Sequence, residues 1–203
     1  MADPTPSKTE GVTKFDCVWT REPLPAALAP AAAGLVACRQ ELFAAGLVGA
    51  DPVTGIGFGN VSLRIGDGGA FLITGSQTGH LPELTAADLS LVDATDLATN
   101  RVQCRGLKPA SSESLSHAAL YRCWPQVHAV IHVHNHALWE RLRNRLPTTP
   151  EDVPYGTPAM AEAIARAAAA PAGVLVMGGH QDGLLAYGPS LAEAARELFG
   201  HGR

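Results

Sequence analysis

An apolar run that ends in two closely spaced histidines constrains the fold of this chain more than any other segment. Residues 127–133 read Val-His-Ala-Val-Ile-His-Val, and this enrichment in β-branched residues predicts a buried β-strand. Side chains at positions i and i+2 of a strand point to the same side, so His132 and His134 should direct two imidazoles toward one point. Imidazole is the commonest neutral ligand of catalytic divalent metals, so the pair predicts a metal site at the end of the strand.

Two further histidines share this parity. His128 lies at the start of the strand and His136 in a helix expected beyond it, so both are weaker candidates for metal binding. The alternative interpretation is that one or two of these histidines are satisfied core or surface residues. The i, i+2 pair behind a buried strand favours the metal.

Predicted helices and strands are interleaved along the chain. We expect helices over residues 25–45, 111–124, 135–143, 157–169 and 191–199, and strands over residues 61–65, 70–73, 127–133, 174–177 and 184–187. Several strands are joined by tight turns, which favours a mixed or largely antiparallel sheet with helices packed against it. Residues 1–20 are polar and lack periodicity, so they predict a flexible tail ahead of a single domain over residues 21–203.

Composition narrows the classes of function. Hydrophobic residues make up 46% of the 203 residues and charged residues 17%, an ordinary globular composition, and the formal net charge is −4. This charge provides no basic face for nucleic acid or an anionic membrane, and no apolar run is long enough to span a bilayer. No signal peptide is recognised, and the four scattered cysteines form no CxxC pair, so we expect a cytoplasmic protein with reduced thiols.

Two other segments carry side chains suited to a catalytic metal site. A catalytic metal needs a third ligand, and His180 stands in a glycine-rich turn between two predicted strands, where it could point into a cleft. Glu113 follows Ser111 and Ser112 at a predicted helix start, where it is either an ordinary capping residue or a carboxylate beside the metal. His117, one turn later, could orient Glu113, although a plain exposed histidine is the simpler interpretation.

Polar turns that contain glycine add possible anion-binding groups. Residues 58–62 include Asn60, and residues 74–79 include Thr78 and Gly79. Such turns are common, but both could present backbone N–H and amide donors to a phosphate or carboxylate. The N–H groups and hydroxyls at Ser111 and Ser112 would suit the same anion.

Taken together, these segments resemble the class II aldolase/adducin family. The order of motifs is the family's own: Gly59-Asn60-Val61-Ser62, a Thr-Gly loop, Ser111-Ser112-Glu113, His132-x-His134 and a later His180. The similarity covers about residue 27 to the C-terminus. It implies a three-layer α/β/α fold with a mostly antiparallel central sheet, a homotetramer with active sites at subunit interfaces, and a divalent metal. The metal is usually Zn²⁺, with Fe²⁺, Mn²⁺ and Co²⁺ as alternatives.

The resemblance also implies roles for individual residues. His132, His134 and His180 correspond to the metal ligands, and Glu113 corresponds to the acid/base that also approaches the metal. The anion-binding set corresponds to Asn60, Thr78, Gly79, Ser111 and Ser112. Such a site would chelate a hydroxy-ketone, stabilise the enediolate that forms when a bond next to the carbonyl breaks, and move the proton through the glutamate.

The chain departs from sugar-phosphate aldolases of this family in three places. The Thr-Gly loop is longer, so Thr74-Gly75 could replace Thr78-Gly79. Gln181 and Asp182 separate His180 from the following glycine. The segment after His134 is shorter, and the tyrosine that those aldolases contribute across the subunit interface has no counterpart other than Tyr155, a weak substitute.

The leading hypothesis is a metal-dependent, aldolase-type lyase that acts on a small sugar-like substrate, phosphorylated or not. A second hypothesis keeps the metal and changes the reaction to that of an epimerase, dehydratase, decarboxylase or iron-dependent oxygenase. Epimerases of the family tend to carry Asp at the position of Glu113, which disfavours that branch. A non-catalytic adducin-like module ranks lowest because adducin head domains have lost the metal histidines, which this chain retains.

Overall fold

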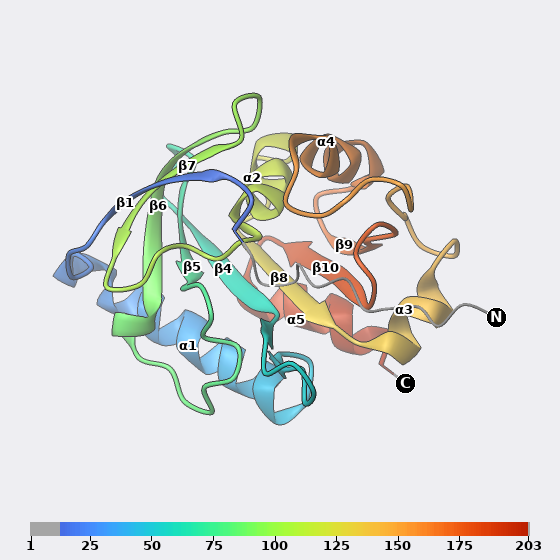
Figure 1. The fold of residues 1–203 in the computed structure, drawn as a ribbon, viewed down its shortest axis with the longest axis horizontal. Coiled ribbons are helices and arrows are strands. Elements are labelled where there is room, and N and C mark those ends of the chain that lie inside the picture. The colour runs from blue at the N-terminus through green and yellow to red at the C-terminus, as the bar shows by residue number, and fades with distance from the viewer. Residues whose placement is uncertain (1–12, 203) are drawn as a thin grey trace.

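An eight-stranded sheet forms the centre of the molecule (Figure 1). The structure is a computed structural model and describes residues 13–202. The strands follow in the spatial order β1 (Asp16–Thr20), β7 (Arg101–Gly106), β6 (Leu89–Asp96), β5 (Ala70–Thr74), β4 (Asn60–Ile65), β8 (Ala129–His134), β10 (Gly183–Gly188) and β9 (Gly173–Val176). Strands β2 (Gly49–Ala50) and β3 (Gly57–Phe58) form a separate pair. Neighbours in the large sheet pair antiparallel, apart from the parallel pair β1–β7.

Helices cover both faces of this sheet. The helices of the described residues are η1 (Ala26–Leu28), α1 (Ala29–Ala44), η2 (Ala86–Asp88), α2 (Ser114–Cys123), α3 (His136–Leu142), α4 (Pro158–Ala167) and α5 (Leu191–Gly200). Helices α1 and α5 lie against one face, while α2 and α4 pack on each other over the opposite face (Figure 1). The expected three-layer α/β/α fold with a mostly antiparallel sheet is confirmed.

Alternation along β8 divides its side chains between two cores. Ala129, Ile131 and Val133 belong to the core beneath α1 and α5, whereas Val130 belongs to the core beneath α2 and α4. His132 has the parity of Val130, so it occupies a core position on the α2 side and is only 1% exposed. A polar ring therefore stands where the pattern of the strand would place an apolar side chain.

The N-terminal boundary of the fold corrects the expected tail. Residues 1–12 lie outside the described residues, but Asp16–Thr20 form β1 and pair with β7. Phe15 is 6% exposed and belongs to the same core as Val130. The prediction of a tail up to residue 20 was wrong from Phe15 onward, because a short edge strand with mixed exposure shows no clear alternation in sequence.

No helix within residues 13–202 combines the length and apolarity that a membrane span requires.

Truncation of Phe15 tests this boundary. We expect Phe15→Ala to lower the free energy of unfolding by about 3 kcal/mol, because it removes a buried ring and leaves a cavity. Val53→Ala is the control, since Val53 is 91% exposed and its truncation should change stability by less than about 0.5 kcal/mol. Denaturant unfolding measures both. Equal losses of stability in the two variants would show that Phe15 does not pack in the core.

Candidate active site

Three histidine side chains converge at one end of the central strands. His132 and His134 come from β8, and His180 comes from the connection between β9 and β10. Their ligand atoms all lie within 4.8 Å of one another, and the Nε2 atoms of His132 and His134 are 3.1 Å apart. The structure thus brings together the three residues that the sequence predicted as metal ligands.

Hydrogen bonding fixes the tautomer of His132. Its Nδ1 lies 3.1 Å from the carbonyl oxygen of Leu184, which can only accept, so Nδ1 carries the proton and the Nε2 lone pair faces His134. Burial holds the pKa of His132 well below its usual range, and the neighbouring His134 and His180 lower it further. The ring is therefore neutral at physiological pH, which is the form that binds a metal.

Neighbouring rings and glycines hold the three imidazoles in place. Phe58 stacks on His134 with 5.3 Å between ring centroids. Gly183 pairs with His134 across β8 and β10, and a Cβ atom there would lie 3.3 Å from the ring of His132 and 3.2 Å from that of His180. Any larger residue at position 183 would therefore crowd two of the candidate ligands.

Asp182, in the turn after His180, links this turn to the start of α3. Asp182 adopts a left-handed conformation with φ of 65°. Its carboxylate lies 2.8 Å from Nδ1 of His136, and its carbonyl oxygen accepts a hydrogen bond from the backbone N–H of Asn135. His136, an additional metal candidate by parity, thus contacts Asp182 on the surface and is not among the three converging histidines.

Glu113 lies at the start of α2 with its carboxylate nearly fully buried. Ser116 donates a hydrogen bond of 2.6 Å to Oε2, whereas Oε1 has no hydrogen-bond partner within the described residues. The backbone N–H of Glu113, the N-cap residue of α2, donates to Oγ of Ser111 at 3.4 Å. One carboxylate oxygen is therefore fixed, and the other remains available to the pocket that Glu113 lines.

His117 does not have the role considered for it. The sequence suggested an exposed residue or a partner of Glu113, but His117 is fully buried and its Nδ1 lies 2.6 Å from Oγ of Ser62. Ser62 also contacts the hydroxyl of Tyr121 at 2.6 Å. Ser116, one residue earlier, orients Glu113. Its spacing of three residues from Glu113 on the same helix was the available signal.

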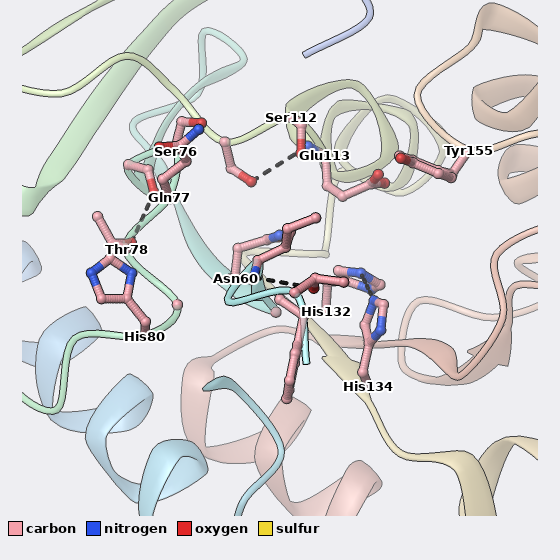
Figure 2. Close-up of a pocket in the computed structure, with 18 of the residues that line it drawn as sticks. Asn60, Ser76, Gln77, Thr78, His80, Ser112, Glu113, His132, His134 and Tyr155 are labelled. Carbon is pink, nitrogen blue, oxygen red and sulfur yellow. Dashed lines mark hydrogen bonds between the residues drawn. The ribbon is translucent and has the colours of Figure 1, made fainter. Parts of the chain in front are cut away.

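A cavity of about 360 Å³ joins these groups to the polar turns (Figure 2). It is lined by all nine predicted site residues, Asn60, Thr78, Gly79, Ser111, Ser112, Glu113, His132, His134 and His180, together with Ser76, Gln77 and Tyr155 among others. Asn60 pairs with His132 across β4 and β8, and its buried Oδ1 has no hydrogen-bond partner among the described residues. This oxygen is therefore available to a ligand.

The loop over residues 75–79 lines the cavity and is held by close contacts. Thr78 donates its hydroxyl proton to the carbonyl oxygen of Gly75, and Gly79 packs so closely that a Cβ atom would lie 2.4 Å from the carbonyl oxygen of Gly49. Thr74 accepts from the backbone of Val61 and does not line the cavity. Gln77, with φ of 57°, was missed by the sequence analysis although it lies in this turn.

Arg39 is a second residue that sequence reasoning missed. It lies on α1, is 1% exposed, and donates to the carbonyl oxygens of Thr78 at 3.1 Å and Gly79 at 2.7 Å. Burial lowers its pKa, and the negative charge of Asp88 opposes that shift. A buried guanidinium thus holds the loop through its carbonyl groups and leaves the N–H groups of the loop to other partners. No sequence motif surrounds Arg39 to signal this.

Comparison with known proteins decides the family. The family model described as "Class II Aldolase and Adducin N-terminal domain" matches residues 34–200. The chain belongs to this family. Its relatives include an aldolase and a dehydratase.

Individual relatives differ in reaction. The methylthioribulose-1-phosphate dehydratase of Methylococcus capsulatus is 42% identical over 81 residues, which are 39% of this chain and 35% of that protein. The L-fuculose-1-phosphate aldolase from Thermus thermophilus is 25% identical, with a TM-score of 0.57 over 84% of this chain and 85% of the other. YgbL of Escherichia coli is 23% identical, with a TM-score of 0.63 over 86% of each chain, and this likeness concerns the fold.

Removal of one imidazole tests the metal site. We expect His132→Ala to weaken zinc binding by at least about a hundredfold, because the buried donor set loses its central ligand. His128→Ala is the matched control, since this histidine shares the parity of His132 but is exposed before β8 begins. Metal analysis after dialysis against a weak chelator measures both. Equal zinc retention in the two variants would refute the assignment.

The buried His117 predicts a pH dependence of stability. Burial lowers the pKa of His117 to about 3, below its value of 6.5 in the unfolded chain, so stability is lost as the pH falls below 6.5. Between pH 7.5 and 5, the native protein should lose about 2 kcal/mol more than the His117→Asn variant. Denaturant unfolding at both pH values measures this difference. If the free energy of unfolding falls equally in the native protein and the variant between these pH values, His117 is not held neutral in the folded state.

Proposed function

We propose that this enzyme is a divalent-metal-dependent lyase that cleaves or forms a carbon–carbon bond next to the carbonyl of a small sugar-like substrate. The observation that carries the proposal is the convergence of three imidazoles and one carboxylate in a single cavity of about 360 Å³. The volume suits a substrate of a few carbon atoms with one charged group.

The donor set fits a catalytic metal. His132 is neutral and buried with its Nε2 lone pair facing His134, and three histidine ligands leave a coordination position for substrate. His132, His134 and His180 would hold the ion, with Zn²⁺ as the proposed metal and Fe²⁺, Mn²⁺ or Co²⁺ as alternatives. When bound, the ion supplies a Lewis acid for the substrate carbonyl.

Glu113 is the proposed acid/base. Its Oε2 accepts from Ser116, so the free Oε1 is the atom that would take and return a proton. In bond cleavage of the aldol type the carboxylate accepts the proton of the hydroxyl group beside the breaking bond. The mostly enclosed position of Glu113 limits competition from water for this proton.

Polar groups that line the same cavity form the proposed anion site. The N–H groups and hydroxyls at Ser111 and Ser112 lie at the approach to α2, and a helix start favours negative charge. The amide of Asn60 and the backbone of residues 76–79 face the same space. These groups support a phosphate or carboxylate handle on the substrate.

A dehydratase is the second candidate. The dehydratase relative from Methylococcus capsulatus, 42% identical over 81 residues, is the observation that favours it. In this reaction Glu113 would take the proton from the carbon next to the carbonyl, and the neighbouring carbon would lose hydroxide. The site residues are the same, so the products decide between the two reactions. The retained histidines and carboxylate argue against a non-catalytic adducin-like module.

Product analysis tests the proposal. The zinc-loaded protein is incubated with ketose 1-phosphates, and mass spectrometry separates cleavage into two carbonyl compounds from loss of one water. Glu113→Gln should reduce either turnover by about 10²–10⁴-fold, because the proton carrier is lost while the metal ligands stay intact. Zinc content is the control. Unchanged turnover in a zinc-retaining Glu113→Gln variant would contradict the role of this residue.

Assembly and location remain predictions. The expected homotetramer would place the pocket near a subunit interface, and light scattering of the purified protein measures the mass of the assembly. The expected cytoplasmic location is part of the same proposal.

A further inference from the structure

Tyr155 lines the pocket and is contacted by Lys14, in the segment that precedes β1. The ring of Tyr155 stacks on His180 with centroids 4.3 Å apart and an interplanar angle of 19°. Figure 2 shows its hydroxyl pointing toward Glu113, and both residues line the same cavity. Tyr155 thus contacts a candidate metal ligand with its ring and directs its hydroxyl toward the proposed acid/base.

Backbone contacts bring this tyrosine to the pocket. A Cβ atom at Gly179 would lie 1.8 Å from the carbonyl oxygen of Val153, and one at Gly178 would lie 2.1 Å from that of Thr149. The two glycines therefore let residues 149–155 pass directly over the turn that carries His180. This path places Tyr155 in the pocket of its own chain.

Lys14 contacts Tyr155 in two ways. Its Nζ donates a hydrogen bond of 3.1 Å to the carbonyl oxygen of Tyr155 and lies 3.5 Å from the centroid of the ring. A single face has no room for both the ammonium group and the ring of His180 at these distances. Lys14 and His180 therefore lie on opposite faces of Tyr155.

The position of Lys14 is itself determined by the fold. Its carbonyl oxygen accepts from Nδ2 of Asn100 at 2.8 Å, and the next residue, Phe15, is buried in the core. Gly156 has φ of 69°, and a Cβ atom there would lie 3.2 Å from the side chain of Lys14. The absence of a side chain at Gly156 leaves room for the lysine beside Tyr155.

The charge of Lys14 also acts on the pocket. Burial lowers the pKa of Lys14, and the negative charge of Glu113 raises it. The carboxylate of the proposed acid/base is therefore within electrostatic reach of the ammonium group. Lys14 combines this charge with two contacts to the tyrosine that borders Glu113.

We propose that Lys14 is a positioning residue that fixes the Tyr155 hydroxyl in the pocket as a hydrogen-bond donor to the substrate oxygen on which negative charge develops. The inference rests on the proposed lyase function, because that reaction generates an oxyanion in the pocket. It assigns a role in the site to the segment before β1, which the sequence analysis treated as a tail.

A double-mutant cycle tests this role by ligand binding. The probe is glycolohydroxamate, a small chelator whose adjacent oxygens imitate an enediolate, titrated calorimetrically into the zinc-loaded protein. Lys14→Met and Tyr155→Phe should each weaken binding by about tenfold, the value of one hydrogen bond to a charged group. The double variant should bind about as well as Tyr155→Phe alone, because both changes act through one hydroxyl.

Three controls separate positioning from general damage. Lys14→Arg keeps the cation and the donor and should restore most of the affinity. Arg101→Met removes an exposed cation from the same β1–β7 edge and should leave binding unchanged. Zinc content and the melting temperature of every variant should remain close to those of the native protein.

The outcomes distinguish this inference from the lyase proposal. Additive losses in the double variant, no effect of Lys14→Met, no rescue by Lys14→Arg, or no binding to the native zinc form would each overturn the positioning role. Coupled losses of binding without turnover of any ketose 1-phosphate would refute the lyase reaction and support the positioning role. Turnover of a ketose 1-phosphate together with independent effects of Lys14→Met and Tyr155→Phe would support the lyase reaction and refute the positioning role.

Discussion

The pocket depends on the antiparallel pairing of β8 between β4 and β10. This register places His132 opposite Asn60 on one side and opposite Leu185 on the other, and it puts the carbonyl oxygen of Leu184 within reach of Nδ1. A shift of one residue would turn both histidines of β8 toward α1 and α5 and would place Val133 in the pocket. The apolar residues of the strand, buried on both faces, make such a shift costly, and the geometry of the site follows from their burial.

Around this strand, loops with little regular structure are held by close backbone contacts. Gly79 packs against the β2–β3 pair, and Gly178 and Gly179 pack against residues 149–153. Arg39, which lies on α1, donates hydrogen bonds to the carbonyl oxygens of Thr78 and Gly79 in the same loop. The polar pocket is thus supported by groups from several distant parts of the chain, and each contact constrains a loop that would otherwise sample many conformations.

Sequence reasoning succeeded where a local pattern has a direct structural consequence. The parity of His132 and His134 predicted their convergence, and the order of motifs predicted that Asn60, Glu113 and His180 would share a site. It failed where burial depends on distant partners. His117 has the local appearance of a surface residue, but Ser62 on β4 and the packing of α2 enclose it. The contact of Lys14 with Tyr155 spans 141 residues, and no local signal announces it.

The sequence by itself determined the alternating strand, the paired imidazoles, the serine-rich start of α2 and the family to which these motifs belong. These are properties of neighbouring residues, whose relative positions follow from the periodicity of strands and helices. The tertiary structure decided which oxygen of Glu113 remains available, which ring nitrogen of His132 is protonated, and which residues support Tyr155. Those properties depend on groups brought together only when the two cores close around the sheet, because hydrogen-bond partners and burial are set by contacts between distant segments.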